Sequence, residues 1–191
     1  MYFPDLGADK IHVFRFNRQT AQPLTAMEKL NLHATPGSGP RHMAFHPNGK
    51  YAYCIEEMGG MVMCFTYNNG KLNLVQRINS NEKKADEYSS ADIHISPDGL
   101  FLYTSNRGEN TIRIFAIGAD GKLTLLGHQS SLGNSPRNFT LDPSGHFLLV
   151  ANQLTNNIVV FKRDLKTGLL KKTGTQIGVP APSCLQMKVY R

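Results

Sequence analysis

The sequence predicts an all-β protein, a β-propeller built from four-stranded antiparallel blades. A segment with a Pro-x-Gly turn occurs three times within the 191 residues, with turns that begin at residues 46, 96 and 142. Short runs of β-branched and aromatic residues surround each turn, and such runs favour strands over helices. Four-stranded units that repeat at about this spacing are typical of propeller blades.

Each unit begins with a strand that runs into the turn, as in "PRHMAF" and "PRNFTL". The three turns are "HPNG" (46–49), "SPDG" (96–99) and "DPSG" (142–145). Proline presets φ at the first turn position, and glycine takes the left-handed φ that closes the turn. A second strand follows directly, as in "KYAYCI". The third strands are "MVMCF" (61–65), "TIRIF" (111–115) and "NIVVF" (157–161). Continuous apolar runs in the second and third strands indicate burial on both faces.

A glycine-containing turn and a weaker fourth strand complete each unit. These turns are "NNG" (68–70), "ADG" (119–121) and "KTG" (166–168). The N-terminus supplies about three strands, because "KIHVF" (10–14) copies the third strand. The tail "PSCLQMKVY" (182–190) aligns with the first strands, and three strands plus one complete a blade. Two arrangements stay open, a closed four-bladed ring and one part of a longer propeller. The units of this single domain are 1–33 plus 182–190, 38–80, 89–131 and 134–176.

Composition narrows the class of protein. With 40% hydrophobic and 18% charged residues, the chain can build one buried core as a soluble domain, and it holds no apolar run of the ~20 residues that a membrane span needs. The three cysteines, Cys54, Cys64 and Cys184, lack metal-ligand spacing, so we expect buried or half-buried thiols in the reducing cytoplasm. The net charge of +7 favours anionic partners. Because Lys and Arg are scattered, we expect neither a nucleic-acid nor a membrane partner.

Three segments resemble a known family. "GPRHMAFHPNGKYAY", "ADIHISPDGLFLYTSNR" and "SPRNFTLDPSGHFLLVANQ" are similar to the propeller lactonases of the 6-phosphogluconolactonase type, and the similarity runs over nearly the whole chain. The resemblance implies a seven-bladed fold, of which this chain would be the C-terminal four blades or so. It implies a lactone hydrolase that converts 6-phosphogluconolactone to 6-phosphogluconate in the pentose phosphate pathway, with neither a metal nor a redox cofactor. Some relatives cyclise or open muconate-type lactones.

The repeats keep their scaffold but change the polar residues at two positions. In a propeller, the first strand of a blade starts where the second strand ends, beside the central axis. At the start of the first strands the chain places Arg41, Ala91, Arg137 and Ser183, followed by His42, Asp92, Asn138 and Cys184. At the end of the second strands it places Glu56, Asn106 and Asn152, followed by Glu57, Arg107 and Gln153. We interpret these unequal side chains as the lining of one pocket for an asymmetric ligand.

A phosphorylated lactone needs cations for its phosphate, donors for the developing oxyanion, and a base that activates water. His42 is the first choice as base because an imidazole titrates near neutral pH, and Glu57 is either a base or its orienting partner. The family motif also points to His42, Glu57 and Arg107 as the catalytic residues. The predicted substrate-binding residues are Arg41, Arg137, Asn138, Asp92 and Gln153, with Asn152 as a further hydrogen-bonding candidate.

Structural roles remain alternatives. His42 could bridge loops, Arg41 and Arg137 could brace neighbouring blades through carbonyl groups, and Glu57 with Arg107 could form an ion pair between blades. Asp92 could be an Asx-turn residue, and His94 is interpreted as a structural histidine. The function could instead be that of a non-catalytic binding module, or of a related lactonase or isomerase for a carboxylate without phosphate. An open arc would expose apolar blade faces, which a homodimer could cover.

Overall fold

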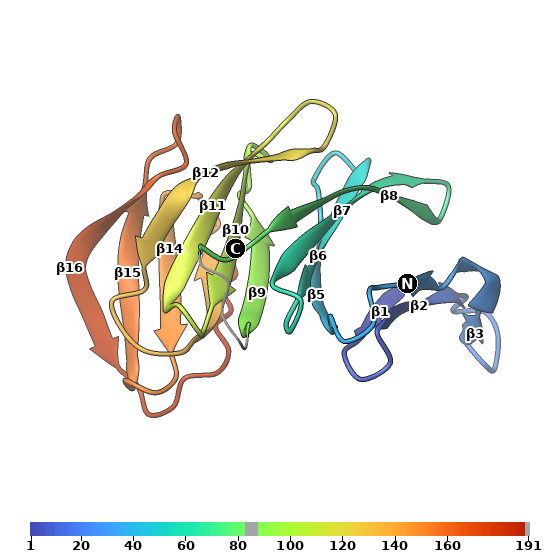
Figure 1. The fold of residues 1–191 in the computed structure, drawn as a ribbon, viewed down its shortest axis with the longest axis horizontal. Coiled ribbons are helices and arrows are strands. Elements are labelled where there is room, and N and C mark those ends of the chain that lie inside the picture. The colour runs from blue at the N-terminus through green and yellow to red at the C-terminus, as the bar shows by residue number, and fades with distance from the viewer. Residues whose placement is uncertain (83–87, 190–191) are drawn as a thin grey trace.

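The computed structural model describes residues 1–82 and 88–189, and it consists of four antiparallel sheets that follow one another in chain order (Figure 1). The second sheet contains β5 (Pro40–Phe45), β6 (Tyr51–Glu56), β7 (Met61–Asn68) and β8 (Lys71–Asn79). The third contains β9 (Ser90–Ile95), β10 (Phe101–Asn106), β11 (Thr111–Ile117) and β12 (Leu123–Ser130). The fourth contains β13 (Pro136–Leu141), β14 (Phe147–Asn152), β15 (Asn157–Arg163) and β16 (Leu170–Gly178). Each of these three sheets pairs consecutive strands, which confirms the predicted all-β class of four-stranded meanders.

The first sheet differs from the other three. It contains β1 (Tyr2–Asp5) and β2 (Lys10–Phe16), with the outer strand split into β3 (Leu24–Ala26) and β4 (Leu32–His33). A short 3-10 helix, η1 (Glu28–Leu30), separates β3 from β4, and both strands pair with β2. This sheet therefore has three strand positions, and among the described residues it has no counterpart of the inner strands β5, β9 and β13.

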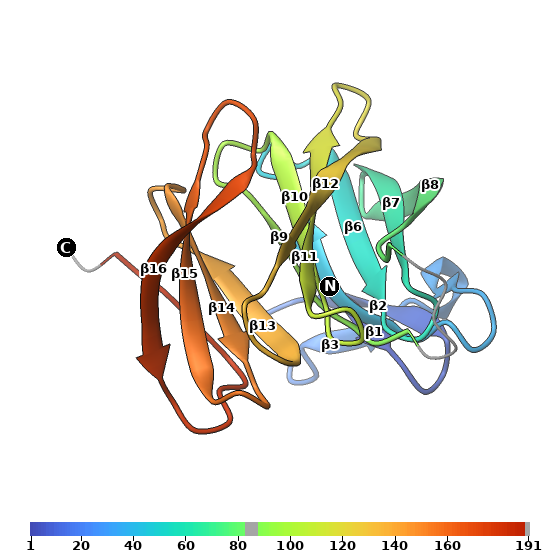
Figure 2. The same ribbon diagram turned by 60° about the vertical axis from the view of Figure 1, so that its left-hand side comes forward.

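The tail does not close a ring. Residues 182–189 form no strand and do not pair with the first sheet, and Figures 1 and 2 place the first and fourth sheets at opposite ends of an arc. The amide of Leu185 instead donates to Oδ1 of Asn138 at 2.6 Å. The amide of Phe139 makes the equivalent bond to Oδ2 of Asp92 in the preceding sheet, at 3.3 Å. The tail thus lies beside β13 and not against the first sheet, and the described chain is an open arc.

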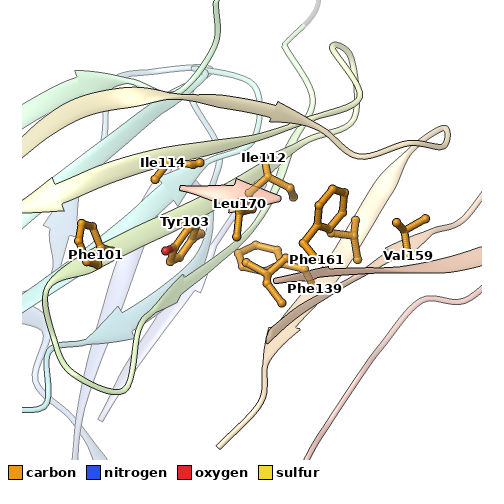
Figure 3. Close-up of a cluster of buried hydrophobic side chains, with 10 residues drawn as sticks. Phe101, Tyr103, Ile112, Ile114, Phe139, Val159, Phe161 and Leu170 are labelled. Carbon is orange, nitrogen blue, oxygen red and sulfur yellow. The ribbon is translucent and has the colours of Figure 1, made fainter. Parts of the chain in front are cut away.

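The core lies between neighbouring sheets. In β10, Leu102 packs toward the second sheet with Phe115, whereas Tyr103 packs toward the fourth. Figure 3 shows Phe139 and Phe161 of the fourth sheet packed in the same cluster as Tyr103. Successive residues of a strand point to opposite faces, so a sheet with a neighbour on each side needs apolar residues at both. Full burial of one such side chain contributes about 1.5–3 kcal/mol.

A repeated tyrosine hydrogen bond joins each sheet to the next. Tyr2, Tyr53 and Tyr103 donate to the carbonyl oxygens of Gly70, Gly121 and Gly168, at 2.7, 2.9 and 2.7 Å. Each of these glycines closes the turn between the third and fourth strands of the following sheet, with φ between +72° and +78°. A Cβ atom on Gly121 would also lie 2.3 Å from the ring of Tyr51. The turn glycines therefore serve both the left-handed conformation and the close approach of two sheets.

The cysteines only partly follow the prediction. Cys54 and Cys64 are buried, and burial raises the pKa of the Cys64 thiol to about 12. Cys184 is exposed because it lies in the tail and not in a sheet, so its predicted burial is wrong. Among the described residues, no helix has the length and apolar character to cross a membrane.

Tyr53→Phe should lower the free energy of unfolding by about 1–3 kcal/mol, because it leaves the buried Gly121 carbonyl without its donor. Tyr51→Phe is a matched control in the same strand, since Tyr51 donates to Ala119 of the same turn at an exposed position. We expect a loss below about 0.5 kcal/mol for the control. Urea denaturation of both variants measures the difference, and equal losses would contradict a role for burial.

Candidate active site

A β-bulge marks the start of each inner strand. The pairing register shifts between Pro40 and His42 in β5 and between Pro136 and Asn138 in β13. A similar shift occurs where β9 pairs with β10, opposite Thr104 and Asn106. The extra residue of a bulge breaks the strict alternation of side chains and changes their direction. As a result, the neighbouring residues Arg41 and His42 line the same groove.

Glu57 lies between two arginines at the axial end of the second and third sheets. Its Oε2 accepts from Arg41 at 3.0 Å, and its Oε1 accepts from Arg107 at 2.5 Å. Arg41 also donates to the Ala91 carbonyl at 2.8 Å, and Arg107 donates to the Ser89 carbonyl at 3.3 Å. The predicted ion pair and the predicted bracing of blades by Arg41 are therefore both present. All three side chains remain partly exposed, so they can also contact a ligand.

The cluster of Arg41, Glu57, Arg107 and Arg137, hereafter the arginine cluster, carries excess positive charge. Burial lowers the pKa of Arg41, Glu57 raises it, and the nearby charges of Arg107 and Arg137 lower it further. Three guanidinium groups against one carboxylate leave a charge of +2 (three minus one). A partly buried site with this excess attracts an anion and binds it through charged hydrogen bonds.

Asp92 is the centre of a second network, which links the inner strands of three sheets. Its carboxyl group is almost fully buried and contacts His42 Nδ1 at 2.8 Å, His94 Nε2 at 3.0 Å and Asn138 Nδ2 at 2.5 Å. Burial raises the pKa of Asp92, but the hydrogen bonds from His42 and His94 outweigh burial and hold this pKa well below its usual range. Asp92 is therefore ionised. The Ile93 amide also donates to Oδ1 of Asp92, at 2.9 Å.

The sequence interpretation set His94 aside as structural, yet it shares the Asp92 carboxylate with His42. Its ring packs edge-on against Phe139, with 4.8 Å between the centroids. The signal that could have found it is the spacing Asp92-x-His94, which places both side chains on one face of β9. Although two histidines and one aspartate meet here, the described residues contain no group of His, Cys, Asp and Glu arranged to hold a metal ion.

Two grooves run along the inner strands. The first has a volume of about 570 Å³ and lies between β1, β5 and β9. The second, of about 700 Å³, lies between β9, β13 and the tail. Asp92 and His94 line both grooves and so separate them, whereas Arg41 and His42 line the first and Asn138 lines the second.

The three predicted amide side chains, Asn138, Gln153 and Asn152, differ in their hydrogen bonds and in their burial. Both ends of the Asn138 amide are engaged, one by Asp92 and one by the Leu185 amide. The backbone amide of Gln153 donates to the Ser135 carbonyl. The Gln153 side chain takes no part in the hydrogen bonds found among the described residues. Asn152 is fully buried and donates to the Ser131 carbonyl at 3.1 Å, so it is wrong as a ligand-binding candidate.

Asn152 and the residues at the same position in the other blades, Glu56 and Asn106, all have structural roles. Glu56 is fully buried and accepts from Arg77 at 2.6 Å and from Ser38 at 3.1 Å. Asn106 is also fully buried, where it accepts from Ser90 at 2.8 Å. At the following position in the second and third sheets, Glu57 and Arg107 keep partly exposed side chains, although neither lines one of the two grooves.

Comparisons with known proteins agree with this architecture. The family described as "Lactonase, 7-bladed beta-propeller" matches residues 1–187. The 6-phosphogluconolactonase of Formosa agariphila is 49% identical over 100% of this chain and 55% of its own length. The crystal structure of a putative 6-phosphogluconolactonase from Bacteroides fragilis superposes with a TM-score of 0.92 and 41% identity, over 97% of this chain and 53% of that one. A periplasmic gluconolactonase of Pseudomonas aeruginosa gives 0.92 and 37%, over 97% and 52%.

The chain thus spans about half the length of these relatives. These comparisons agree with a propeller fold for the four sheets. They do not test the predicted position among the C-terminal blades, which stays a prediction.

Asp92→Asn should reveal the sign of the Asp92 pKa shift. An aspartate in the unfolded chain has a pKa of about 3.9, and the folded-state pKa of Asp92 is lower. The ionised carboxylate therefore stabilises the fold above about pH 4, and this contribution is lost as the pH falls through the folded-state value. We expect the variant to differ from the wild type more at about pH 5 than at about pH 3 in urea denaturation. A difference independent of pH would contradict the shift.

Proposed function

Because the chain belongs to the lactonase family of seven-bladed β-propellers, we propose that it hydrolyses 6-phosphogluconolactone to 6-phosphogluconate in the groove between β1, β5 and β9. The observation that carries the proposal is the positively charged arginine cluster, whose member Arg41 lines this groove together with His42. No single blade contains this combination. It arises where the ends of three consecutive blades meet.

The arginines serve the anionic parts of the substrate. A phosphate group takes parallel hydrogen bonds from the planar guanidinium fork, and a developing oxyanion needs donors that are already in place. Arg41 and Arg107 are held in place by Glu57 and by backbone carbonyls, so little reorganisation is needed when charge develops. These two arginines are the proposed oxyanion donors. Arg137, for which the described residues provide no such brace, is the proposed phosphate ligand.

His42 is the proposed general base. Its Nδ1 faces Asp92, and 43% of its side chain is exposed. In the proposed step, Nε2 takes a proton from water while the water oxygen bonds to the lactone carbonyl carbon. The carbonyl oxygen becomes the oxyanion beside the arginines. Collapse of this intermediate breaks the bond between the carbonyl carbon and the ring oxygen, and the proton passes from His42 to the leaving alkoxide.

Glu57 has a different proposed role. Both of its oxygens accept from arginines, which leaves neither one directed at water without competition. We therefore assign it the positioning of Arg41 and Arg107, and not the role of base. This role differs from both that the sequence left open, base and orienting partner of His42, because Asp92 and not Glu57 contacts His42.

A lactone without phosphate is the second candidate substrate, because one solved relative is named a gluconolactonase. The two substrates make different demands on Arg137, since only the phosphorylated lactone offers it a dianion. A non-catalytic binding module remains the outcome to accept if neither lactone is hydrolysed above its spontaneous rate.

Location and assembly are also part of the proposal. The odd number of cysteines supports a location in the cytoplasm, although one solved relative is named periplasmic. Cell fractionation would decide between the two locations.

At the open ends of the arc, Phe3, Phe16, Phe147 and Ile177 are exposed. Such apolar faces support the expected homodimer, which light scattering would detect as twice the chain mass.

His42→Ala should lower the rate of 6-phosphogluconolactone hydrolysis by about 10²–10⁴-fold, after correction for spontaneous hydrolysis, because one acid–base group is lost. Arg107→Ala should cost about 10²–10³-fold in kcat, as expected for an oxyanion donor. Arg18→Ala, at an exposed position outside the site, is the matched control and should change nothing. Full activity in both site variants would overturn the assignment.

Arg137→Ala separates the two substrates. It should raise KM for 6-phosphogluconolactone about tenfold or more, as expected for a lost charged hydrogen bond, and leave gluconolactone hydrolysis nearly unchanged. Equal effects on the two lactones would show that Arg137 does not bind phosphate.

A further inference from the structure

The Asp92 carboxylate lies within hydrogen-bond distance of five nitrogen atoms that belong to the inner strands of three blades. We propose that Asp92 sets the proton positions of two histidines in opposite senses, with His42 protonated at Nδ1 and His94 protonated at Nε2. Only one consequence of this proposal rests on the proposed function, namely that Asp92 is a positioning residue for the base His42.

Two of the five hydrogen bonds have a fixed direction, because they come from backbone N–H groups, which can only donate. Oδ1 of Asp92 accepts from the Ile93 amide at 2.9 Å, and Oδ2 accepts from the Phe139 amide at 3.3 Å. The side chain of Asn138 has one possible orientation for the same reason. The Leu185 amide donates to its Oδ1 at 2.6 Å, so the Nδ2 group must be the one that faces Asp92, at 2.5 Å.

With these three donors in place, each carboxylate oxygen has one remaining hydrogen-bond partner among the described residues, and that partner is a histidine. Oδ1 lies 2.8 Å from Nδ1 of His42, and Oδ2 lies 3.0 Å from Nε2 of His94. An ionised carboxylate only accepts, so both of these ring nitrogens must carry protons. These hydrogen bonds outweigh the effect of burial and stabilise the ionised form of Asp92, in agreement with the low pKa described above.

In their neutral forms, the two imidazoles therefore expose opposite nitrogens. His42 keeps a lone pair on Nε2, for which the described residues provide no hydrogen-bond partner, and its ring lines the first groove. His94 keeps its lone pair on Nδ1, and its contact with Phe139 restricts the ring. A base needs its lone pair on the side of the substrate, and the carboxylate also stabilises the imidazolium that forms when Nε2 takes a proton.

The direct test is ¹⁵N NMR of the full chain with labelled histidines at about pH 8, above the ordinary histidine pKa of about 6.5. Ring nitrogens with and without a proton differ in chemical shift and in their couplings to ring protons. The chain has 7 histidines, so the signals are assigned by their loss in His42→Gln and His94→Gln. We expect a proton on Nδ1 of His42 and on Nε2 of His94. A proton on Nε2 of neutral His42 would overturn the proposal.

Two variants test whether Asp92 is the cause. In Asp92→Asn, one amide oxygen replaces two carboxylate oxygens and the new amino group donates, so the His42 signals should shift away from the pure Nδ1–H form. The kcat for the lactone should fall on the order of 10²–10⁴-fold with little change in KM. His94→Gln is the matched control, because it keeps the carboxylate on His42, and the His42 signals should stay unchanged. Unchanged His42 signals in Asp92→Asn would refute the role of Asp92.

The NMR result does not depend on catalysis, so failures of the two proposals are distinguishable. Wild-type protein with the expected proton positions but without lactone hydrolysis would overturn the proposed function and leave the role of Asp92 intact. Active protein in which His42 carries its proton on Nε2 would leave the function intact and overturn the role of Asp92.

Discussion

The face-to-face packing of neighbouring sheets is the interaction on which the rest of the structure depends. Each blade is too thin to bury its apolar residues alone, so Leu102 and Tyr103, adjacent in β10, must find partners in two different sheets. The tyrosine bonds to the turn glycines add direction to this packing, because each hydroxyl must meet one carbonyl of the next blade. Together they determine the distance and rotation between blades, and hence which strand ends meet.

The candidate site follows from that geometry. Inner strands start, and second strands end, at the same end of every blade, so residues about fifty positions apart become neighbours. Glu57 meets Arg107 in this way, and His42 meets Asp92. The bulges at the starts of the strands then let consecutive residues reach one groove. A repeated scaffold can therefore carry an asymmetric site, provided that each copy contributes a different side chain.

Structural and functional interpretations of these residues are compatible. Arg41 braces the Ala91 carbonyl with its Nε atom and leaves its terminal nitrogens to Glu57 and the groove. Asp92 joins β9 to β13 through the Phe139 amide and also contacts two imidazoles. The same hydrogen bonds that hold the blades together reduce the reorganisation needed at the site, which is the condition for electrostatic stabilisation of a transition state.

The sequence by itself determined the repeat, the strands and the turns. Pro-x-Gly turns and apolar runs buried on both faces are local features, so they can be recognised without the contacts between blades. The sequence also predicted that Arg41, His42, Glu57 and Arg107 occupy the strand ends that meet beside the axis in successive blades. Only the tertiary structure decided which polar positions are buried, as for Asn152, and where the tail lies, as for Leu185. It also brought His94 to Asp92 and His42. Such outcomes depend on the packing angle between blades and on local bulges, and neither is encoded in the spacing of residues along one strand.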